Sequence, residues 1–122
     1  MKLLVYGTLK KGYYNHDTFL STAKYLGERK VHGYTLYSLG SYPTAVKEKD
    51  SYINGELYEV DNNTMHSILW MERGAGYDIE IVDDDIILFY YHKEDLEKIS
   101  HKEKIGATWN EDVVHFGLSS ES

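Results

Sequence analysis

The sequence contains no cysteine and only one proline, Pro43. The absence of cysteine excludes disulfides, thiolate nucleophiles and cysteine-bound metals. With a single proline, no stretch has the composition of a stiff proline-rich linker. Long apolar runs are also missing, because the run at residues 3–6 is too short for a signal peptide or a membrane span. We therefore expect a soluble, cytoplasmic protein with no membrane partner.

Positive charge is scarce and scattered along the chain. There are 13 Lys and Arg against 20 Asp and Glu, which gives a formal net charge of −7. Binding to a phosphate backbone needs a concentrated basic face, so we do not expect nucleic acid as a partner. The length of 122 residues and the hydrophobic content of 42% fit a single soluble domain over residues 1–122.

Several signatures of catalysis and metal binding are absent as well. The six histidines have no HExxH or paired metal-ligand spacing, and the sequence has no GxSxG elbow, GxGxxG loop or Walker loop. The run Asp83–Asp85 does not match the spacing of an EF-hand loop, so we interpret it as a solvated hairpin tip. We therefore expect neither a metal nor a cofactor.

Tyrosine is unusually frequent, with 12 copies against 3 Phe. Tyrosine favours strands and packs well in a core. Its hydroxyl also allows phenols to line a pocket. Composition alone leaves both interpretations open, and most of the tyrosines are expected to serve the first purpose.

The order of apolar segments and turn signals predicts an α+β fold with a mostly antiparallel or mixed sheet. A sheet of this kind can curl into a barrel. The apolar run at 2–6 is typical of a strand buried on both faces, and Gly55 indicates a bulge or a close backbone approach. The other expected strands are 25–38, 44–46, 52–60, 77–82 and 86–92, and the expected helices are 16–22, 62–72 and 93–99. Turns are expected at Gly40–Pro43, Lys47–Asp50 and Asp83–Asp85, and the tail after about residue 100 has no assigned structure.

The helix expected at 62–72 carries the first candidate for chemistry, Glu72. Asp61 is a suitable N-cap, and Ile68 and Leu69 begin an apolar stripe that Glu72 continues at a spacing of four and three residues. Glu72 therefore lies on the core face, in the last helical turn. Burial and the negative end of the helix dipole both raise the pKa of a carboxyl there. A carboxyl tuned toward neutral pH suits general acid/base catalysis, although most glutamates at helix ends simply reach water.

The second candidate is the loop Tyr6-Gly7-Thr8-Leu9, which follows the first strand. A buried strand that runs into a glycine-containing loop leaves several backbone N–H groups without partners. Such groups can converge on a carboxylate or an oxyanion. Many strand-to-loop turns have a similar sequence, so the loop is a candidate site only in combination with Glu72.

These segments together resemble the gamma-glutamylcyclotransferase-like (AIG2-like) family. The resemblance covers roughly residues 2–95 and rests on the order of its motifs. The motifs are Tyr6-Gly7-Thr8-Leu9, Lys11-Gly12, Asn15-His16, Leu26-Gly27, Gly33-Tyr34, Leu36-Tyr37, Gly40-Ser41-Tyr42-Pro43, residues 54–61, Glu72, Gly76-Tyr77 and Phe89-Tyr90-Tyr91. The resemblance implies a small mixed β-barrel with flanking helices.

The resemblance also implies a site and a reaction. Glu72 matches the catalytic glutamate, Tyr6–Leu9 would hold the α-carboxylate and amine of a small γ-glutamyl substrate, and Tyr42, Tyr77 and Tyr91 match pocket positions. The family's enzymes release 5-oxoproline and an amine or amino acid by cyclising the substrate, and they need no cofactor.

Two positions depart from the family pattern, and two other functions remain open. Family members often carry an acidic residue at the position of Leu69 and a basic residue at that of Ile79, and both changes bear on substrate choice.

One alternative is a non-catalytic module that binds a small ligand or a protein through the same pocket. The other is an amide-cleaving or isomerising enzyme that uses the same carboxyl. The sequence specifies neither the leaving amine nor the oligomeric state.

Overall fold

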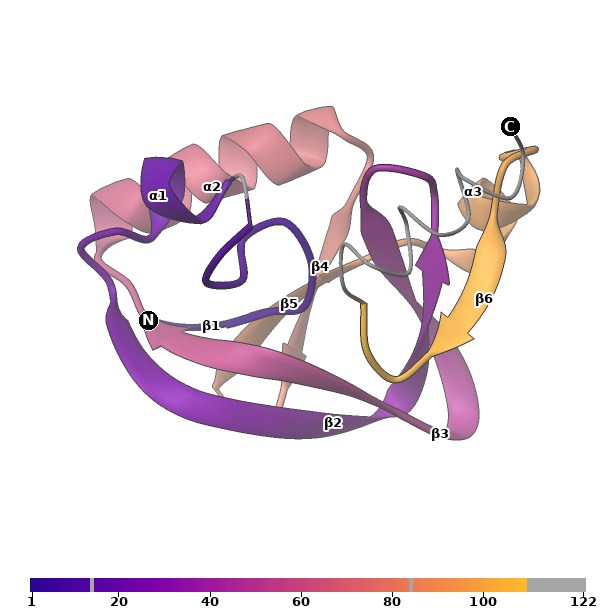
Figure 1. Ribbon diagram of the computed structural model, residues 1–122, viewed down its shortest axis with the longest axis horizontal. Coiled ribbons are helices and arrows are strands. Elements are labelled where there is room, and N and C mark those ends of the chain that lie inside the picture. Colours follow the sequence, from indigo (N-terminus) through magenta and orange to yellow (C-terminus); the bar gives the residue numbers. More distant parts are fainter. Residues whose placement is uncertain (14, 84, 110–122) are drawn as a thin grey trace.

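The computed structural model describes residues 1–13, 15–83 and 85–109. In this part of the chain, one six-stranded sheet is flanked by three helices (Figure 1). The elements in chain order are β1 (Lys2–Val5), α1 (His16–Phe19), β2 (Lys24–Ser38), β3 (Pro43–Glu59), α2 (Asn62–Gly74), β4 (Asp78–Val82), β5 (Ile86–Tyr90), α3 (Lys93–Glu97) and β6 (Glu103–Gly106). This arrangement confirms the predicted α+β class.

The sheet is mixed and bends toward a barrel. Its strand order is β4-β5-β1-β3-β2-β6, and only β1 and β5 pair in parallel. Strand β1 ends at Val5, and beyond that point its two neighbours meet directly. The amide of Tyr91 donates a hydrogen bond to the carbonyl of Ala45 on β3 at 2.9 Å. This contact joins the segment after β5 to β3 just past the end of β1, where the candidate loop begins.

Strand β1 is buried on both faces, as its continuous apolar sequence predicts. Leu3 and Val5 belong to the core that α2 covers, to which the helix contributes Met65 and Ile68. Leu4 faces the opposite core, inside the curve of the sheet. Helix α2 lies across the top of the molecule in Figure 1, with α1 beside its first half. The centre of the fold is therefore the point from which the candidate loop emerges.

Strand β3 is much longer than the sequence suggested, and the turn expected at Lys47–Asp50 lies within its bounds, where residues 48–51 have no partner on β2. The strand runs from Pro43 to Glu59 and pairs with β2 along most of its length. The polar residues in the middle of β3 are exposed or half-buried, so they lack the apolar periodicity by which a sequence reveals a core strand. Asp50, at φ 66°, marks a local irregularity near the register shift between His32 and Tyr34.

Gly55 confirms the expectation of a close backbone approach. A Cβ atom added there would lie 2.7 Å from the carbonyl oxygen of Val5, so β1 and β3 could not pack at this distance around a larger residue. The register shifts of β2 and β3 fall elsewhere, between Tyr25 and Gly27 and between His32 and Tyr34. The alternative of a bulge at Gly55 is therefore wrong.

The helices and the hairpin β4–β5 follow the prediction with small changes of length. Helix α1 is shorter than the expected 16–22, and α3 is shorter than the expected 93–99. The short strand β6 pairs with β2, and Trp109 is 1% exposed in the core inside the sheet. The sequence had left this region unassigned. The apolar segment 113–118 lies outside the described residues.

Candidate active site

Helix α2 positions Glu72 at the inner side of its last turn. The helix begins where the Asp61 side chain accepts a hydrogen bond from the amide of Thr64 at 2.7 Å, which fixes the phase of the turns that follow. Met65 and Ile68 are buried, so the stripe that they begin carries Glu72 toward the sheet. The helix ends at Gly74, and Gly76 follows at φ 96°. The placement of Glu72 on the core face is thus confirmed.

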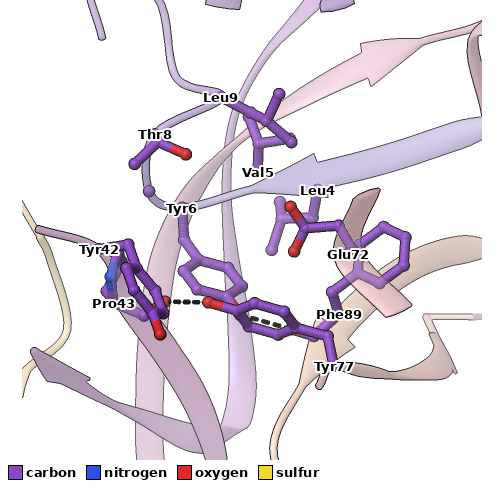
Figure 2. Close-up of a pocket in the computed structure, with 11 residues that line it drawn as sticks. Leu4, Val5, Tyr6, Thr8, Leu9, Tyr42, Pro43, Glu72, Tyr77 and Phe89 are labelled. Carbon is purple, nitrogen blue, oxygen red and sulfur yellow. Dashed lines mark hydrogen bonds between the residues drawn. The ribbon is translucent and has the colours of Figure 1, made fainter. Parts of the chain in front are cut away.

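A small pocket surrounds this carboxyl (Figure 2). Residues 4–9 form one side, from the end of β1 into the loop that follows it. The remaining lining comes from segments far apart in sequence, namely Tyr42, Pro43, Glu72, Tyr77 and Phe89. The volume is about 40 Å³, enough for a few water molecules. The pocket therefore brings together Glu72, the Tyr6–Leu9 loop, Tyr42 and Tyr77, as the sequence analysis expected.

The Glu72 carboxyl is electrostatically unusual. Burial raises the pKa of this group from its ordinary 4.5 to about 7, because the low-polarity surroundings disfavour the charged form. We find no hydrogen bond between this carboxyl and any other described residue. Figure 2 shows it pointing into the space between Leu4, Leu9 and Phe89. The group is therefore able both to accept and to release a proton near neutral pH.

The loop after β1 uses its carbonyls but leaves amide groups available. The amide of Lys10 donates to the carbonyl of Gly7, and the amide of Asn15 donates to the carbonyl of Thr8, each at 3.0 Å. The ring of His16 lies 2.9 Å from the carbonyl of Leu9. Within the described residues, we find no acceptor for the amide N–H groups of Gly7, Thr8 and Leu9. These three consecutive residues border the pocket, so their amides can serve a bound anion.

The loop after β1 packs against Pro43 at Gly7, and this contact requires a residue without a side chain. A Cβ atom there would lie 2.7 Å from both Cδ and Cγ of Pro43. The loop after β1 can therefore rest against the start of β3 only with glycine at this position. This contact joins two sides of the pocket that are more than thirty residues apart in the sequence.

The buried phenols hold backbone segments around the pocket. Tyr6 donates a hydrogen bond to the carbonyl of Phe89 and accepts one from the amide of Ala45 at 3.1 Å. The Tyr77 hydroxyl donates to the carbonyl of Pro43, as a dashed line in Figure 2 shows. Burial raises the pKa of Tyr6 and Tyr77 far above the ordinary value. Both hydroxyls therefore stay protonated at neutral pH and hold the neighbouring backbone segments through their hydrogen bonds.

Tyr91 is not among the residues that line the pocket. Its ring packs against Tyr77 with the centroids 4.6 Å apart. Its hydroxyl donates to the carbonyl of Ala75 at 2.5 Å, just past the end of α2. Tyr91 thus supports the helix end that carries Glu72 and does not border the pocket itself.

Pro43 and Phe89 are lining residues whose roles the sequence analysis missed. Pro43 lies in the predicted Gly40–Pro43 turn, and its position before a strand was a usable signal. Phe89 belongs to an apolar strand, β5, with no feature that separates pocket-facing from core-facing positions. The alternation of the strand places Phe89 with Ile87 and Tyr91 on the face that α2 covers, and the sequence alone did not show which of the two faces that would be.

Leu69 and Ile79, where the sequence departs from the family pattern, lie outside the pocket. Both line a separate hollow, which we call the α2 groove, between α2 and the outer strands. Its lining consists of Met1, Asn62, Met65, His66, Leu69, Ile79 and Ile87. The α2 groove has a volume of about 390 Å³. The two departures therefore lie at the same groove, apart from the pocket that contains the Glu72 carboxyl.

The acidic hairpin tip is engaged in surface ion pairs. Asp83 lies 3.1 Å from Arg29, and Asp85 lies 3.1 Å from Lys2. Among residues 1–13, 15–83 and 85–109, no three His, Asp or Glu side chains gather in a way that could hold a metal. In the same part of the chain, no helix has the length and apolar character needed to cross a bilayer.

Comparison with known proteins identifies relatives in sequence. A family model described as "Gamma-glutamyl cyclotransferase, AIG2-like" matches residues 3–110. A protein of Methanocaldococcus jannaschii is 39% identical over 77 residues, a match that covers 62% of this chain and 63% of the relative. The gamma-glutamylcyclotransferase family protein YtfP of Escherichia coli K12 is 34% identical over 83 residues, covering 67% of this chain and 72% of that protein. The match thus spans somewhat under two thirds of the Methanocaldococcus relative.

Solved structures share the fold. The crystal structure of uncharacterized protein PH0828 from Pyrococcus horikoshii has a TM-score of 0.68 and 29% identity, covering 98% of this chain and 97% of that one. The solution structure of YtfP from Escherichia coli has a TM-score of 0.67 and 27% identity, covering 88% of this chain and 93% of that one. The chain belongs to the gamma-glutamyl cyclotransferase, AIG2-like, family, as the match over residues 3–110 and the shared fold together show.

Proposed function

We propose that the protein is a gamma-glutamyl cyclotransferase acting on a small γ-glutamyl compound. In this reaction the α-amine nitrogen of the substrate bonds to the γ-carbonyl carbon, and the bond from that carbon to the leaving nitrogen breaks. The products are 5-oxoproline and an amine or amino acid. The observation that carries the proposal is the Glu72 carboxyl, with its pKa raised to about 7, in a pocket beside the amides of Gly7, Thr8 and Leu9.

An intramolecular reaction suits a pocket without a protein nucleophile. The attacking amine and the carbonyl belong to the same molecule, so the protein needs only to fold the substrate into a reactive shape. Holding two reacting groups in line can contribute roughly 7–11 kcal/mol to lowering a barrier. The absence of cysteine from the chain is therefore compatible with catalysis of this kind.

Glu72 would carry the proton through the reaction. In its ionised form it takes a proton from the attacking α-ammonium nitrogen, and in its protonated form it gives that proton to the leaving nitrogen. The second proton of the attacking nitrogen leaves after the new bond has formed and passes through the same carboxyl to the released amine, which departs as an ammonium ion. A group with a pKa near the working pH performs both transfers with little bias against either. The burial that raises the pKa of Glu72 supports this double role.

The amides of the loop would hold the negative charges of the substrate. A run of backbone N–H groups binds a carboxylate or the oxyanion that develops on the γ-carbonyl oxygen. Gly7, Thr8 and Leu9 supply three such groups, and the contact of Gly7 with Pro43 keeps the loop in place. Tyr42 and Tyr77 would flank the glutamyl carbon chain, and Tyr91 would keep the end of α2 in position.

A γ-glutamyl group is larger than the present pocket of about 40 Å³. Tyr42 is a partly exposed lining residue, on the loop between β2 and β3. We expect its side chain to turn outward when substrate enters. The leaving group would then lie toward this opening, where the protein encloses it least.

The test is release of 5-oxoproline from a panel of γ-glutamyl compounds. The panel contains γ-glutamyl amino acids, γ-glutamyl amines, γ-glutamyl-ε-lysine and glutathione, and each is tested with the wild type, Glu72→Gln and Glu94→Gln. Glu94 is exposed on α3, so its variant controls for the loss of a carboxylate elsewhere. Turnover that Glu72→Gln loses and Glu94→Gln retains supports the proposal.

Two outcomes would count against this function. Amine release without 5-oxoproline would indicate an amide-cleaving enzyme that uses the same carboxyl. Absence of turnover across the panel by a folded protein, together with measurable binding of one of the compounds, would favour a binding module.

A further inference from the structure

Asn15 and His16, at the start of α1, contact the loop after β1 through three hydrogen bonds. The main-chain amide of Asn15 donates to the carbonyl of Thr8 at 3.0 Å. The side-chain Nδ2 of Asn15 donates to the hydroxyl of Thr8 at 2.8 Å. The carbonyl of Leu9 can only accept, so Nδ1 of His16, 2.9 Å away, carries the hydrogen. The reaction proposed above gives these contacts no task, although they hold two of the three residues whose amides border the pocket.

The bond to the Thr8 carbonyl sets the direction of the next amide. In an ordinary trans peptide, the C=O group and the N–H group that follows it point in opposite directions. Because the Thr8 carbonyl points toward Asn15, the N–H of Leu9 points away from the start of α1. Among the described residues we find no acceptor for this N–H, so it is available to a bound anion.

The bond to the Thr8 side chain sets the direction of hydrogen bonding at its hydroxyl. A hydroxyl has one hydrogen to donate and two lone pairs that accept, whereas an amide NH₂ group can only donate. Nδ2 of Asn15 therefore occupies a lone pair of Thr8 and leaves the hydroxyl hydrogen for another partner. In the described part of the chain we find no acceptor for this hydrogen. Thr8 lines the Glu72 pocket, where Figure 2 shows it beside Leu9, so the hydroxyl can donate to a ligand there.

We propose that the Thr8 hydroxyl donates a hydrogen bond to the α-carboxylate of the bound substrate, and that Asn15 is a positioning residue that keeps this hydroxyl a donor. The inference rests on the proposed function, because it requires a ligand with a carboxylate beside the loop. A carboxylate can accept about four hydrogen bonds, so the hydroxyl adds to the loop amides and does not compete with them. A bond from a hydroxyl to an ionised acceptor is stronger than one between neutral groups.

The expected signature is weaker binding with an unchanged chemical step. The α-carboxylate stays ionised before, during and after the cyclisation, so this bond is as strong in the ground state as in the transition state. Its loss raises KM and leaves kcat nearly constant. The product 5-oxoproline keeps the same carboxylate, so its binding reports on the contact without any turnover.

Thr8→Val tests the hydroxyl, because valine keeps the shape of the side chain. We expect it to raise KM for the turned-over substrate, and the dissociation constant of 5-oxoproline measured by calorimetry, each about tenfold or more. Thr8→Ser keeps the hydroxyl and should stay within about threefold of the wild type, the difference reflecting the freer rotation of serine. Thr18→Val, at an exposed position of α1, is the matched control and should leave both constants unchanged.

Asn15→Asp tests the positioning role. A carboxylate only accepts, so it draws the hydroxyl hydrogen of Thr8 toward itself, and we expect the dissociation constant of 5-oxoproline to rise roughly tenfold. The new negative charge also repels the ligand. The same change is therefore made together with Thr8→Val, where only the repulsion remains, and there it should weaken binding by no more than about twofold.

The outcomes separate this inference from the proposed function. Unchanged binding of 5-oxoproline by folded Thr8→Val overturns the inference, as does a wild type that does not bind 5-oxoproline. A fall in kcat at constant KM would place the hydroxyl at the developing oxyanion and overturns its assignment to the carboxylate. An equal effect of Asn15→Asp with and without Thr8→Val overturns the role of Asn15. A wild type that shows the expected binding pattern but releases no 5-oxoproline supports the inference and overturns only the proposed function.

Discussion

Helix α2 borders two hollows of opposite character. At its last turn lies the Glu72 pocket of about 40 Å³, and between α2 and strands β4 and β5 lies the α2 groove of about 390 Å³. The smaller hollow contains the Glu72 carboxyl and is bordered by Gly7, Thr8 and Leu9, and among the described residues we find no hydrogen-bond partner for this carboxyl or for these three amides. The larger one is mostly apolar. The comparison teaches that volume and unpartnered polar groups select different hollows, and the proposed function rests on the polar groups and not on the volume.

The largest expected difference between variants of the two hollows is in the rate of 5-oxoproline release. Glu72→Gln removes the proton carrier, and we expect it to lower 5-oxoproline release by about a thousandfold, within the range usual for general acid/base groups. His66→Ala alters the rim of the α2 groove and should change the rate by less than about twofold, because that groove lies outside the site. Steady-state assays of both variants check this. A large loss in His66→Ala would show that the two hollows are not independent.

Gly7→Ala should have the next largest effect. The added methyl group would lie 2.7 Å from the Pro43 ring, so the loop must shift, at about 1–3 kcal/mol of stability and at least about a tenfold loss in kcat/KM. Gly74→Ala is the matched control, because no atom would contact its Cβ within 4 Å. Urea denaturation and kinetics of both variants provide the measurement. Unchanged kcat/KM in Gly7→Ala would remove the loop from the mechanism.

The raised pKa of Glu72 predicts a dependence of stability on pH. Its folded-state pKa of about 7 exceeds the ordinary 4.5, so the stability linked to its protonated form is complete below about pH 4.5 and is lost as the pH rises through 7. Glu72→Gln is neutral throughout, and we expect it to be more stable than the wild type at pH 8 by about 1–3 kcal/mol. Denaturation of both proteins at pH 5 and pH 8 measures this. Lower stability of the variant at pH 8 would indicate that the carboxylate has a structural partner.

Tyr91→Phe should have the smallest effect of the four. It deletes the hydroxyl that donates to Ala75 and should cost about 1 kcal/mol of stability. Because Tyr91 holds the end of α2 and does not line the pocket, we expect kcat to fall a few-fold while KM changes little. A rise in KM with constant kcat would instead place Tyr91 against the substrate.

Local signals in the sequence predicted much of the site. The position of Glu72 followed from the cap at Asp61 and from the helical spacing of Ile68 and Leu69, which act within a few residues. The loop at Tyr6–Leu9 followed from a buried strand that ends in glycine. Both features depend on short-range geometry, which a single sequence specifies well.

The features that escaped prediction depend on contacts between distant segments. Lys47–Asp50 looked like a turn because its polar residues have no apolar periodicity, yet it lies within the bounds of β3, where residues 48–51 form an unpaired stretch between the pairs Tyr34–Lys47 and His32–Tyr52. Which carbonyl a buried phenol reaches, as Tyr77 reaches that of Pro43, depends on the curvature of the sheet. The burial of Trp109 likewise depends on how the segment after β6 returns to the core. Long-range packing decides such features.

The bonds of Tyr6 have a consequence for motion in the pocket. Its hydroxyl joins the carbonyl of Phe89 to the amide of Ala45, so the first residue of the loop that borders the pocket is held to both strands that flank β1. Segments tied to a core in this way open only in the slowest, largest fluctuations of a protein. The amide of Ala45 should therefore exchange with deuterium at the rate of global unfolding. The loop after β1 and the sheet then form one cooperative unit.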